Sequence, residues 1–420
     1  MYRYVNSVLP LRQASMDKST EFSDQVDGWI RERVGSGIVT WSHLVTSLPG
    51  VYPTTIMESL DRLRLRQFVE FGHIEKRASD FLSLRLWKRG LIPTPHPLDF
   101  NWWFDGDSLK FLLEYMNGGA QPGQEVVMLG TPTLFQAALL AGPKHRLTLL
   151  DRDAAAISYC NGATALCVDL ARDQLPKLSA QLVIADPPWY EEEMKAFLWA
   201  ARQLAAVGAR VIMSVPPRGT RPGVLEEWKG IINWARILGL TFERLELARV
   251  GYYSPMFERN ALNACAVPLP TENWRRGDLA TFRCERVNRA KRPIVKYSEY
   301  WEERVISTVR IRVRIRGDNE SWDPKLKPII HGDILPTVSR RDPVRDSIDV
   351  WTSANRVFRC DGVRALLSIL DALGSGGDPL TRVQQDFQLG RRHGTGIRHA
   401  AAQIAKLIKA EQRELARYAD

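Results

Sequence analysis

The stretch that decides the fold of this chain is residues 180–190, which read AQLVIADPPWY. Its first six residues are mostly apolar and partly β-branched, as expected of a strand buried in a parallel sheet. Pro187 and Pro188 then end the strand and fix the backbone, and the acids at 191–193 favour the start of a helix. The pattern predicts strand, rigid loop and helix. Asp186 then stands at the carboxyl end of the strand, the edge where open α/β sheets bind ligands.

The loop after this strand also carries a chemical signature. Asp186-Pro187-Pro188-Trp189-Tyr190 resembles the Asp/Asn/Ser-Pro-Pro-aromatic motif of S-adenosylmethionine-dependent amino-methyltransferases. An acid and a backbone carbonyl can accept the hydrogens of an amine and aim its lone pair at a sulfonium carbon, while an aromatic ring stacks on a planar substrate. These five residues are therefore the candidate catalytic residues. The alternative is that Asp186 only caps the following helix.

Composition bounds the class of protein. The chain has 420 residues, 45% hydrophobic and 25% charged, which is typical of a globular protein of two or three domains. No apolar run approaches the roughly 18 residues of a membrane span, and the N-terminus lacks the apolar core of a signal peptide. The five cysteines are scattered and form no Cys-x-x-Cys pair. We expect a reduced, cytoplasmic protein with no membrane association and no metal site.

Residues 1–92 are predicted to form a winged helix-turn-helix domain after a loose N-terminal arm. Apolar residues recur at helical spacing in three segments, and an alternating, strand-like run follows them, at 22–34, 40–48, 54–64 and 67–74. Domains of this kind bind DNA through the second helix of the motif. They also serve as packing or dimer modules, so DNA binding and a homodimer both remain open.

Residues 93–267 are predicted to form an α/β domain with a Rossmann-like sheet of the class I methyltransferase type. Strands and helices alternate regularly, which is the pattern of a parallel sheet with helices on both faces. Two late strands without a helix between them suggest an antiparallel hairpin at the sheet edge. The predicted strands are 126–130, 147–151, 163–169, 182–186, 209–215, 241–250 and 260–267.

The strand ends of this domain supply a candidate cofactor site. Gly130 and Thr131 follow the first strand, where such folds place the methionine part of the cofactor. Asp151 ends the second strand and could accept both ribose hydroxyls, with Asp153 as the second choice for that role. Asp169 ends the third strand, where an acid could meet the adenine amino group. The first loop lacks Gly-x-Gly-x-x-Gly, which argues against a dinucleotide.

Three segments together resemble the bis-aminopropyl spermidine (branched-chain polyamine) synthase family. They are PLDFNW at 97–102, DLARDQLP at 169–176 and DPP at 186–188, and with the winged helix the resemblance covers roughly residues 20–267. It implies decarboxylated S-adenosylmethionine as donor and transfer of an aminopropyl group to a polyamine nitrogen. That family's first loop follows its glycine with several acids, whereas this chain has Thr131-Pro132-Thr133.

These patterns favour a transferase that alkylates an amine nitrogen with S-adenosylmethionine or its decarboxylated form. A methyltransferase that acts on an amine nitrogen is the first reading, with nucleic acid as one acceptor that this leaves open. An aminopropyltransferase and a non-catalytic module that binds nucleic acid or protein are the alternatives.

Residues 268–420 are predicted to be a basic α+β extension, with 29 Lys and Arg against 20 Asp and Glu. Residues 305–316 alternate strictly and predict one strand whose polar face carries Arg310, Arg312, Arg314 and Arg316. That face could track phosphates, protect a sheet edge or pair with acids of a partner. We expect a nucleic-acid or protein partner here, and a docking helix at 397–418.

Overall fold

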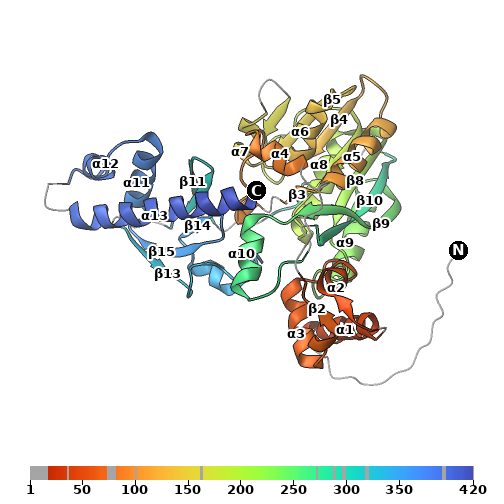
Figure 1. The fold of residues 1–420 in the computed structure, drawn as a ribbon. Coiled ribbons are helices and arrows are strands. Elements are labelled where there is room, and N and C mark those ends of the chain that lie inside the picture. Colours follow the sequence, from red (N-terminus) through yellow and green to blue (C-terminus); the bar gives the residue numbers. More distant parts are fainter. Residues whose placement is uncertain are drawn as a thin grey trace.

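The computed structural model describes residues 18–35, 37–72, 82–99, 102–160, 164–270, 273–286, 290–295, 299–316, 321–389 and 394–419. Figure 1 shows three parts: a small helical group at the N-terminus, a central sheet flanked by helices, and a second sheet with helices at the C-terminus. Residues 1–17 of the arm predicted at 1–20 and the end of the strand predicted at 67–74 lie outside the described residues, and a helix already begins at Lys18. No helix in the described part of the chain is both long and apolar enough to span a bilayer.

The central sheet has the order β3-β9-β10-β8-β7-β4-β5-β6. The five adjacent strands β6, β5, β4, β7 and β8 run parallel to one another. Strand β10 runs antiparallel between β8 and β9, and the short β3 pairs with the other edge of β9. This is the strand layout of a class I methyltransferase, as predicted. The strands are β3 (Trp103–Phe104), β4 (Glu125–Leu129), β5 (Arg146–Asp151), β6 (Ala165–Cys167), β7 (Ala180–Ala185), β8 (Ala205–Val215), β9 (Leu240–Tyr253) and β10 (Arg275–Cys284).

Alternation along the central strands separates two apolar cores, one on each face. On β7, Val183 and Ala185 pack toward α8 (Glu191–Leu204) and α9 (Val224–Ile237). Leu182 and Ile184 pack on the other face, toward α5 (Gly106–Gly119) and α6 (Pro132–Leu140). The short helix α7 (Ala154–Ser158) follows β5. Because both faces are covered, β7 reads as a continuous apolar run.

Two details of this domain differ from the prediction. The strand expected at 260–267 is wrong, since those residues belong largely to α10 (Met256–Ala264), whose Phe257 and Ala261 are buried at helical spacing. The last strand is β10, and the sheet therefore extends past residue 267, where we placed the end of the domain. Asp105 caps α5 by accepting the N–H of Ser108 at 2.7 Å.

The N-terminal group packs against the central domain. It contains α1 (Lys18–Val34), α2 (Trp41–Thr46) and α3 (Pro53–Leu63), and β1 (Val39–Thr40) pairs in parallel with β2 (Val69–Glu70). Its core continues into Leu262 and Trp274, and the indole of Trp41 donates to the carbonyl of Pro268 at 2.8 Å. The described residues include the three predicted helices but not 73–81, so the winged-helix assignment stays a prediction.

The C-terminal part is a five-stranded sheet in the order β11-β12-β14-β15-β13, with three helices. The single strand predicted at 305–316 is wrong: Ser307, with φ of 58°, lies in a tight turn that splits the run into a hairpin. The elements are β11 (Trp301–Ile306), β12 (Val309–Arg314), β13 (Lys325–Pro328), β14 (Val350–Thr352), β15 (Val357–Asp361), α11 (Val363–Ser375), α12 (Pro379–Asp386) and α13 (Gly394–Ala419).

Helix α13 joins this part to the central domain. Ile404 and Ile408 pack into the core of the C-terminal part. At the other end of the helix, the Tyr418 hydroxyl donates to the carbonyl of Ser254 at 2.7 Å, and its ring meets Tyr253 edge-on with centroids 5.6 Å apart. The end of α13 therefore reaches the central sheet, as Figure 1 also shows.

Candidate active site

Two cavities meet at the carboxyl edge of the central sheet, where the predicted site residues come together. The first is lined by four of the predicted cofactor residues: Gly130, Asp151, Asp153 and Asp169. The second is lined by Pro187, Trp189 and Tyr190 of the loop after β7. Both cavities are lined by Trp102, Asp186 and Pro188.

Gly130 lines the first cavity without a side chain, and its backbone is left-handed, with φ of 65°. A Cβ at this position would lie 3.0 Å from the Phe197 ring and 3.1 Å from the carbonyl oxygen of Asp186. Both the left-handed backbone and this close packing require glycine. The next residue, Thr131, is buried, and its hydroxyl has no hydrogen-bond partner among the described residues.

Asp151 and Asp153 differ in what they contact. The carboxylate of Asp151 accepts the N–H of Asp153 at 2.8 Å, and desolvation raises its pKa to about 6. Asp153 caps α7 by accepting the N–H of Ala155 at 3.0 Å, and it also pairs with Arg310 at 3.0 Å. Since Asp153 is already engaged by a cap and an ion pair, Asp151 is the better candidate for the ribose.

Asp169 lies on a tight loop directly after β6. Its carboxylate accepts the N–H of Ala171 at 2.9 Å, and its own N–H donates to Asp173 at 2.8 Å. These contacts hold the carboxylate at the wall of the first cavity. Two further acids, Asp99 and Glu193, also line this cavity and were not among the predicted cofactor residues.

Asp186, at the junction, is held by two hydroxyl groups from neighbouring strands. Tyr252 of β9 donates to its Oδ1 at 2.8 Å, and Ser214 of β8 donates to the same oxygen. Desolvation raises the pKa of the carboxyl to about 7, although both hydrogen bonds oppose the rise. The residue thus changes charge near neutral pH. Sequence reasoning missed Ser214 and Tyr252, because neither lies in a recognisable motif.

The two aromatic residues of the loop have different surroundings. Trp189 meets Tyr252 edge-on with centroids 5.7 Å apart, and its indole N–H donates to Ser214 at 3.4 Å. Tyr190 instead faces the C-terminal part: its hydroxyl accepts the N–H of Arg340 at 3.2 Å, and that guanidinium lies 4.7 Å from its ring. Trp189 therefore lines the second cavity beside Asp186, while Tyr190 lines it where the C-terminal part packs against the loop.

All three parts of the chain form the walls of the second cavity. Tyr52, Thr54 and Thr55 come from the N-terminal group, and the C-terminal part supplies Thr337, Val338, Ser339 and Arg341. Among the described residues that line it, Asp186 is the one acid, while Arg221, Arg275 and Arg341 are cationic. Rings of Trp102, Trp189, Tyr190 and Tyr252 complete the lining, so the cavity suits a planar, uncharged group with an anion nearby.

The predicted arginine face does not present four free cations to solvent. The side chain of Arg310 is 1% exposed and is paired with three acids, and Arg312 is paired with two of them. Arg314 pairs with Glu299 at 3.5 Å, and Arg316, which is 45% exposed, pairs with Asp349 at 2.9 Å. The alternation predicted a shared face correctly, but that face packs against acidic residues of this chain.

Comparison with known families identifies the central domain. Residues 100–218 match the family model described as "Probable N6-adenine methyltransferase", a span that includes Gly130, Asp151, Asp169 and the loop at 186–190. The chain carries a class I S-adenosylmethionine-dependent transferase domain. The predicted transferase is thereby confirmed: this domain uses S-adenosylmethionine or its decarboxylated form and alkylates an amine nitrogen. No match was found among curated proteins.

Several solved structures are similar to this chain. A branched-chain polyamine synthase variant from Thermus thermophilus, in complex with N4-aminopropylspermidine and 5′-methylthioadenosine, is 17% identical over 67% of this chain and 97% of that one, with a TM-score of 0.49. A putative RNA methyltransferase from Pyrococcus horikoshii is 17% identical over 49% and 98% of the two chains, with a TM-score of 0.35. A 16S rRNA N2 G1207 methyltransferase from T. thermophilus is 13% identical over 62% and 52%, with a TM-score of 0.28.

Proposed function

We propose that the transferase domain methylates an exocyclic amine of a nucleobase, such as N6 of adenine, presented in nucleic acid. The observation that carries this proposal is the meeting of the two cavities at Asp186 and Pro188. One cavity then holds the donor and the other the acceptor, and the reacting atoms meet beside the Asp-Pro-Pro-Trp loop.

The residues of the first cavity fit S-adenosylmethionine. Gly130 lets the backbone approach the methionine part, whereas the predicted Thr131 is buried and is not among the described residues that line this cavity. The carboxylate of Asp151 can accept hydrogen bonds from both ribose hydroxyls, and that of Asp169 from the adenine amino group. Bound S-adenosylmethionine supplies an electrophilic methyl group on a sulfonium.

Asp186 is proposed to orient the acceptor amine. In its ionised form, the carboxylate accepts one hydrogen of the amine, the Pro187 carbonyl accepts the other, and the nitrogen lone pair points toward the donor cavity. Positive charge grows on the nitrogen during transfer, so a fixed negative charge stabilises the transition state more than the ground state. Tyr252 and Ser214 hold the carboxylate in place and leave it one oxygen, Oδ2, for the amine.

The charge of the second cavity argues for a nucleobase over a polyamine. A polyamine carries several positive charges and would need acids along its path, whereas Asp186 is the one acid among the described residues of the lining. The three arginines of the lining are paired with Glu227 or Glu258, so these two acids are already engaged. A planar base can instead stack on Trp189 and be enclosed by Trp102 and Tyr252. Aminopropyl transfer is therefore the less favoured reading of this site.

A nucleic-acid acceptor also needs cations at the cavity mouth, and Arg341 is the strongest candidate. It lines the acceptor cavity and its side chain is 58% exposed, with one ion pair to Glu227 at 3.4 Å. A phosphate beside the flipped base could replace that acid as its partner. Phosphate contact is thus assigned to Arg341 instead of the predicted face at 310–316.

A transfer assay with two donors tests this function. The protein is incubated with methyl-labelled S-adenosylmethionine or with propylamine-labelled decarboxylated donor, together with DNA, RNA or spermidine. We expect label from the methyl donor in nucleic acid, and loss of that transfer in Asp186→Asn with donor binding kept. Transfer of the propylamine label to spermidine, with none from the methyl donor, would overturn the proposal.

A further inference from the structure

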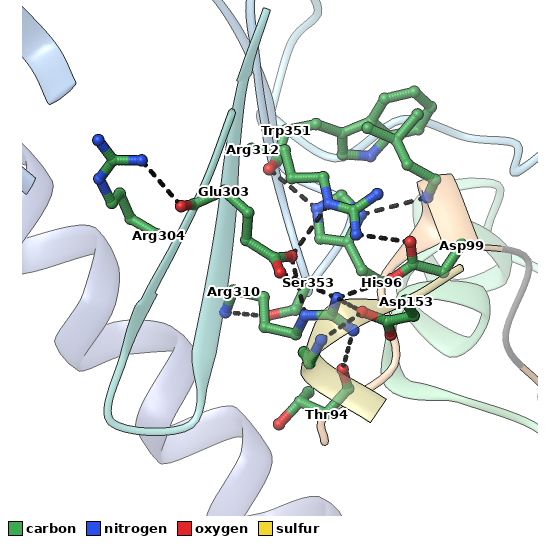
Figure 2. A network of polar contacts seen from close by, with 12 residues as sticks. Thr94, His96, Asp99, Asp153, Glu303, Arg304, Arg310, Arg312, Trp351 and Ser353 are labelled. Carbon is green, nitrogen blue, oxygen red and sulfur yellow. Dashed lines mark hydrogen bonds and ion pairs between the residues drawn. The ribbon is translucent and has the colours of Figure 1, made fainter. Parts of the chain in front are cut away.

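One arginine of the C-terminal hairpin is buried beside the donor cavity. Arg310 of β12 is paired with Asp99 at 2.9 Å, Asp153 at 3.0 Å and Glu303 at 2.9 Å, and it donates to the carbonyl of Thr94 at 3.0 Å. These partners come from the segment before β3, from the cap of α7 and from β11. Figure 2 shows the guanidinium at the centre of the three carboxylates.

Removal of the Arg310 guanidinium would leave the charges of its acidic partners uncompensated. The side chain is 1% exposed, and an unpaired charge at such a depth is strongly destabilising. Arg312 adds a second cation, at 2.5 Å from Asp99 and 3.0 Å from Glu303, whereas the ion pair with Asp153 is made by Arg310. Arg310 is thus the cation that ties Asp153 to the C-terminal hairpin.

Asp153 connects this network to the donor cavity. Its carboxylate and that of Asp99 both line the cavity, and Asp153 Oδ2 is buried without a hydrogen-bond partner among the described residues. The backbone N–H of Asp153 donates to the carboxylate of Asp151 at 2.8 Å. Arg310 therefore contacts the same residue whose backbone N–H donates to the proposed ribose acid.

We propose that Arg310 is a positioning residue for the donor: its guanidinium holds Asp99 and Asp153 in the cavity wall, so the docked C-terminal hairpin completes the site. This inference rests on the donor site proposed above. Without Arg310, the carboxylates of Asp99, Asp151 and Asp153 repel one another, and the loop that carries Asp151 relaxes. Through Arg310 the C-terminal part then acts on donor affinity, in addition to the contacts that Thr337 and Arg341 make at the acceptor cavity.

The test compares Arg310→Met with Arg304→Met by calorimetric titration of S-adenosylhomocysteine into the full chain. Arg304 lies on the same hairpin and also loses ion pairs, but these are with Asp371 of α11 and with Glu302. Its contact with the network is a hydrogen bond to the backbone carbonyl of Glu303, as Figure 2 shows, and not to a carboxylate. We expect Arg310→Met to weaken binding by about tenfold or more and Arg304→Met to leave it within about twofold. With saturating donor, the turnover of Arg310→Met should stay near that of the wild type.

A rescue variant separates positioning from folding. Asp153→Asn keeps an oxygen for the Ala155 N–H and removes the charge that Arg310 neutralises. Added to Arg310→Met, it should recover most of the lost affinity. Arg310→Lys, which keeps the charge but not the fork of donors, should fall between wild type and Arg310→Met, and it also serves if Arg310→Met does not fold.

Three results would overturn the inference: wild-type binding by a folded Arg310→Met, equal weakening by Arg304→Met, or no recovery on adding Asp153→Asn. Failure of the wild type to bind any donor would instead remove the donor site itself.

Discussion

Replacement of Asp186 by asparagine should abolish most transfer while leaving the fold and donor binding in place. Asparagine keeps an oxygen for the hydroxyls of Ser214 and Tyr252, but it has no negative charge to offer the amine. Removal of a preorganised group that stabilises growing charge lowers the rate by about a hundredfold or more. The loss should appear in turnover, since the donor is held mainly by other residues.

The pH dependence of the wild type gives a second signature. The pKa of Asp186 is raised to about 7, so about one-tenth of the carboxyl is ionised at pH 6 and about nine-tenths at pH 8. If the ionised form is the active one, kcat/KM should rise about tenfold over this interval. The residual rate of Asp186→Asn should lack this rise, because the group that titrates is gone.

Stability supplies the control. The folded-state pKa of Asp186 is above its unfolded value of 3.8, so its contribution to the free energy of unfolding is largest below pH 3.8 and is lost as the pH rises through 7. The loss is about 4 kcal/mol at most, because partial exposure to the cavity screens the charge. At pH 8 Asp186→Asn should therefore be at least as stable as the wild type. Urea unfolding measures this, and single-turnover transfer beside donor calorimetry measures the rest. Wild-type turnover by Asp186→Asn would refute the reasoning.

Four further outcomes are expected. Trp189→Leu should raise the KM for an oligonucleotide by about tenfold, since stacking on a base contributes about 1–3 kcal/mol; donor calorimetry should be unchanged, and an unaltered KM would remove the ring from the acceptor site. Asp151→Asn should weaken donor binding by about tenfold or more with little effect on turnover, because hydrogen bonds to a charged group contribute about 1.5–3 kcal/mol; equal binding by calorimetry would exclude the ribose role. Arg341→Ala should lower the log–log salt slope of oligonucleotide binding by about one unit, whereas Arg236→Ala, exposed at the end of α9, should not; the same slope in both variants would argue against phosphate contact. Burial raises the pKa of Glu411 to about 8, so the wild type should lose stability to urea as the pH rises from 6 to 9 while Glu411→Gln loses less; parallel profiles would contradict this.

The sequence predicted where the proposed donor residues lie, because their placement depends on local patterns. Apolar runs followed by Gly130, Asp151, Asp169 and Asp186 place each side chain at a strand end, and parallel strands bring those ends to one edge of the sheet. This inference needs only the apolar pattern of the strands and the proline, glycine or aspartate residues that follow each strand.

The acceptor side could not be predicted in this way, because long-range packing forms it. Tyr52 and Arg341 line one cavity although they are far apart in the chain, and Ser214 and Tyr252 are ordinary strand residues until they meet Asp186. The arginine alternation predicted a face but not its partner, since Asp99 is remote in sequence from Arg310. The wrong strand at 260–267 shows that a short apolar run cannot be told from a buried helix by period alone.

We propose above all that a methyl group passes from the donor to the exocyclic amine of a nucleobase beside the loop at 186–190. The most direct test of this proposal is to incubate the protein with S-adenosylmethionine and adenine-containing DNA or RNA, digest the product to nucleosides and analyse these by mass spectrometry. We expect a nucleoside methylated on the exocyclic nitrogen of its base, formed by the wild type and nearly absent with Asp186→Asn. Methylation on carbon or oxygen, or equal product with Asp186→Asn, would contradict it.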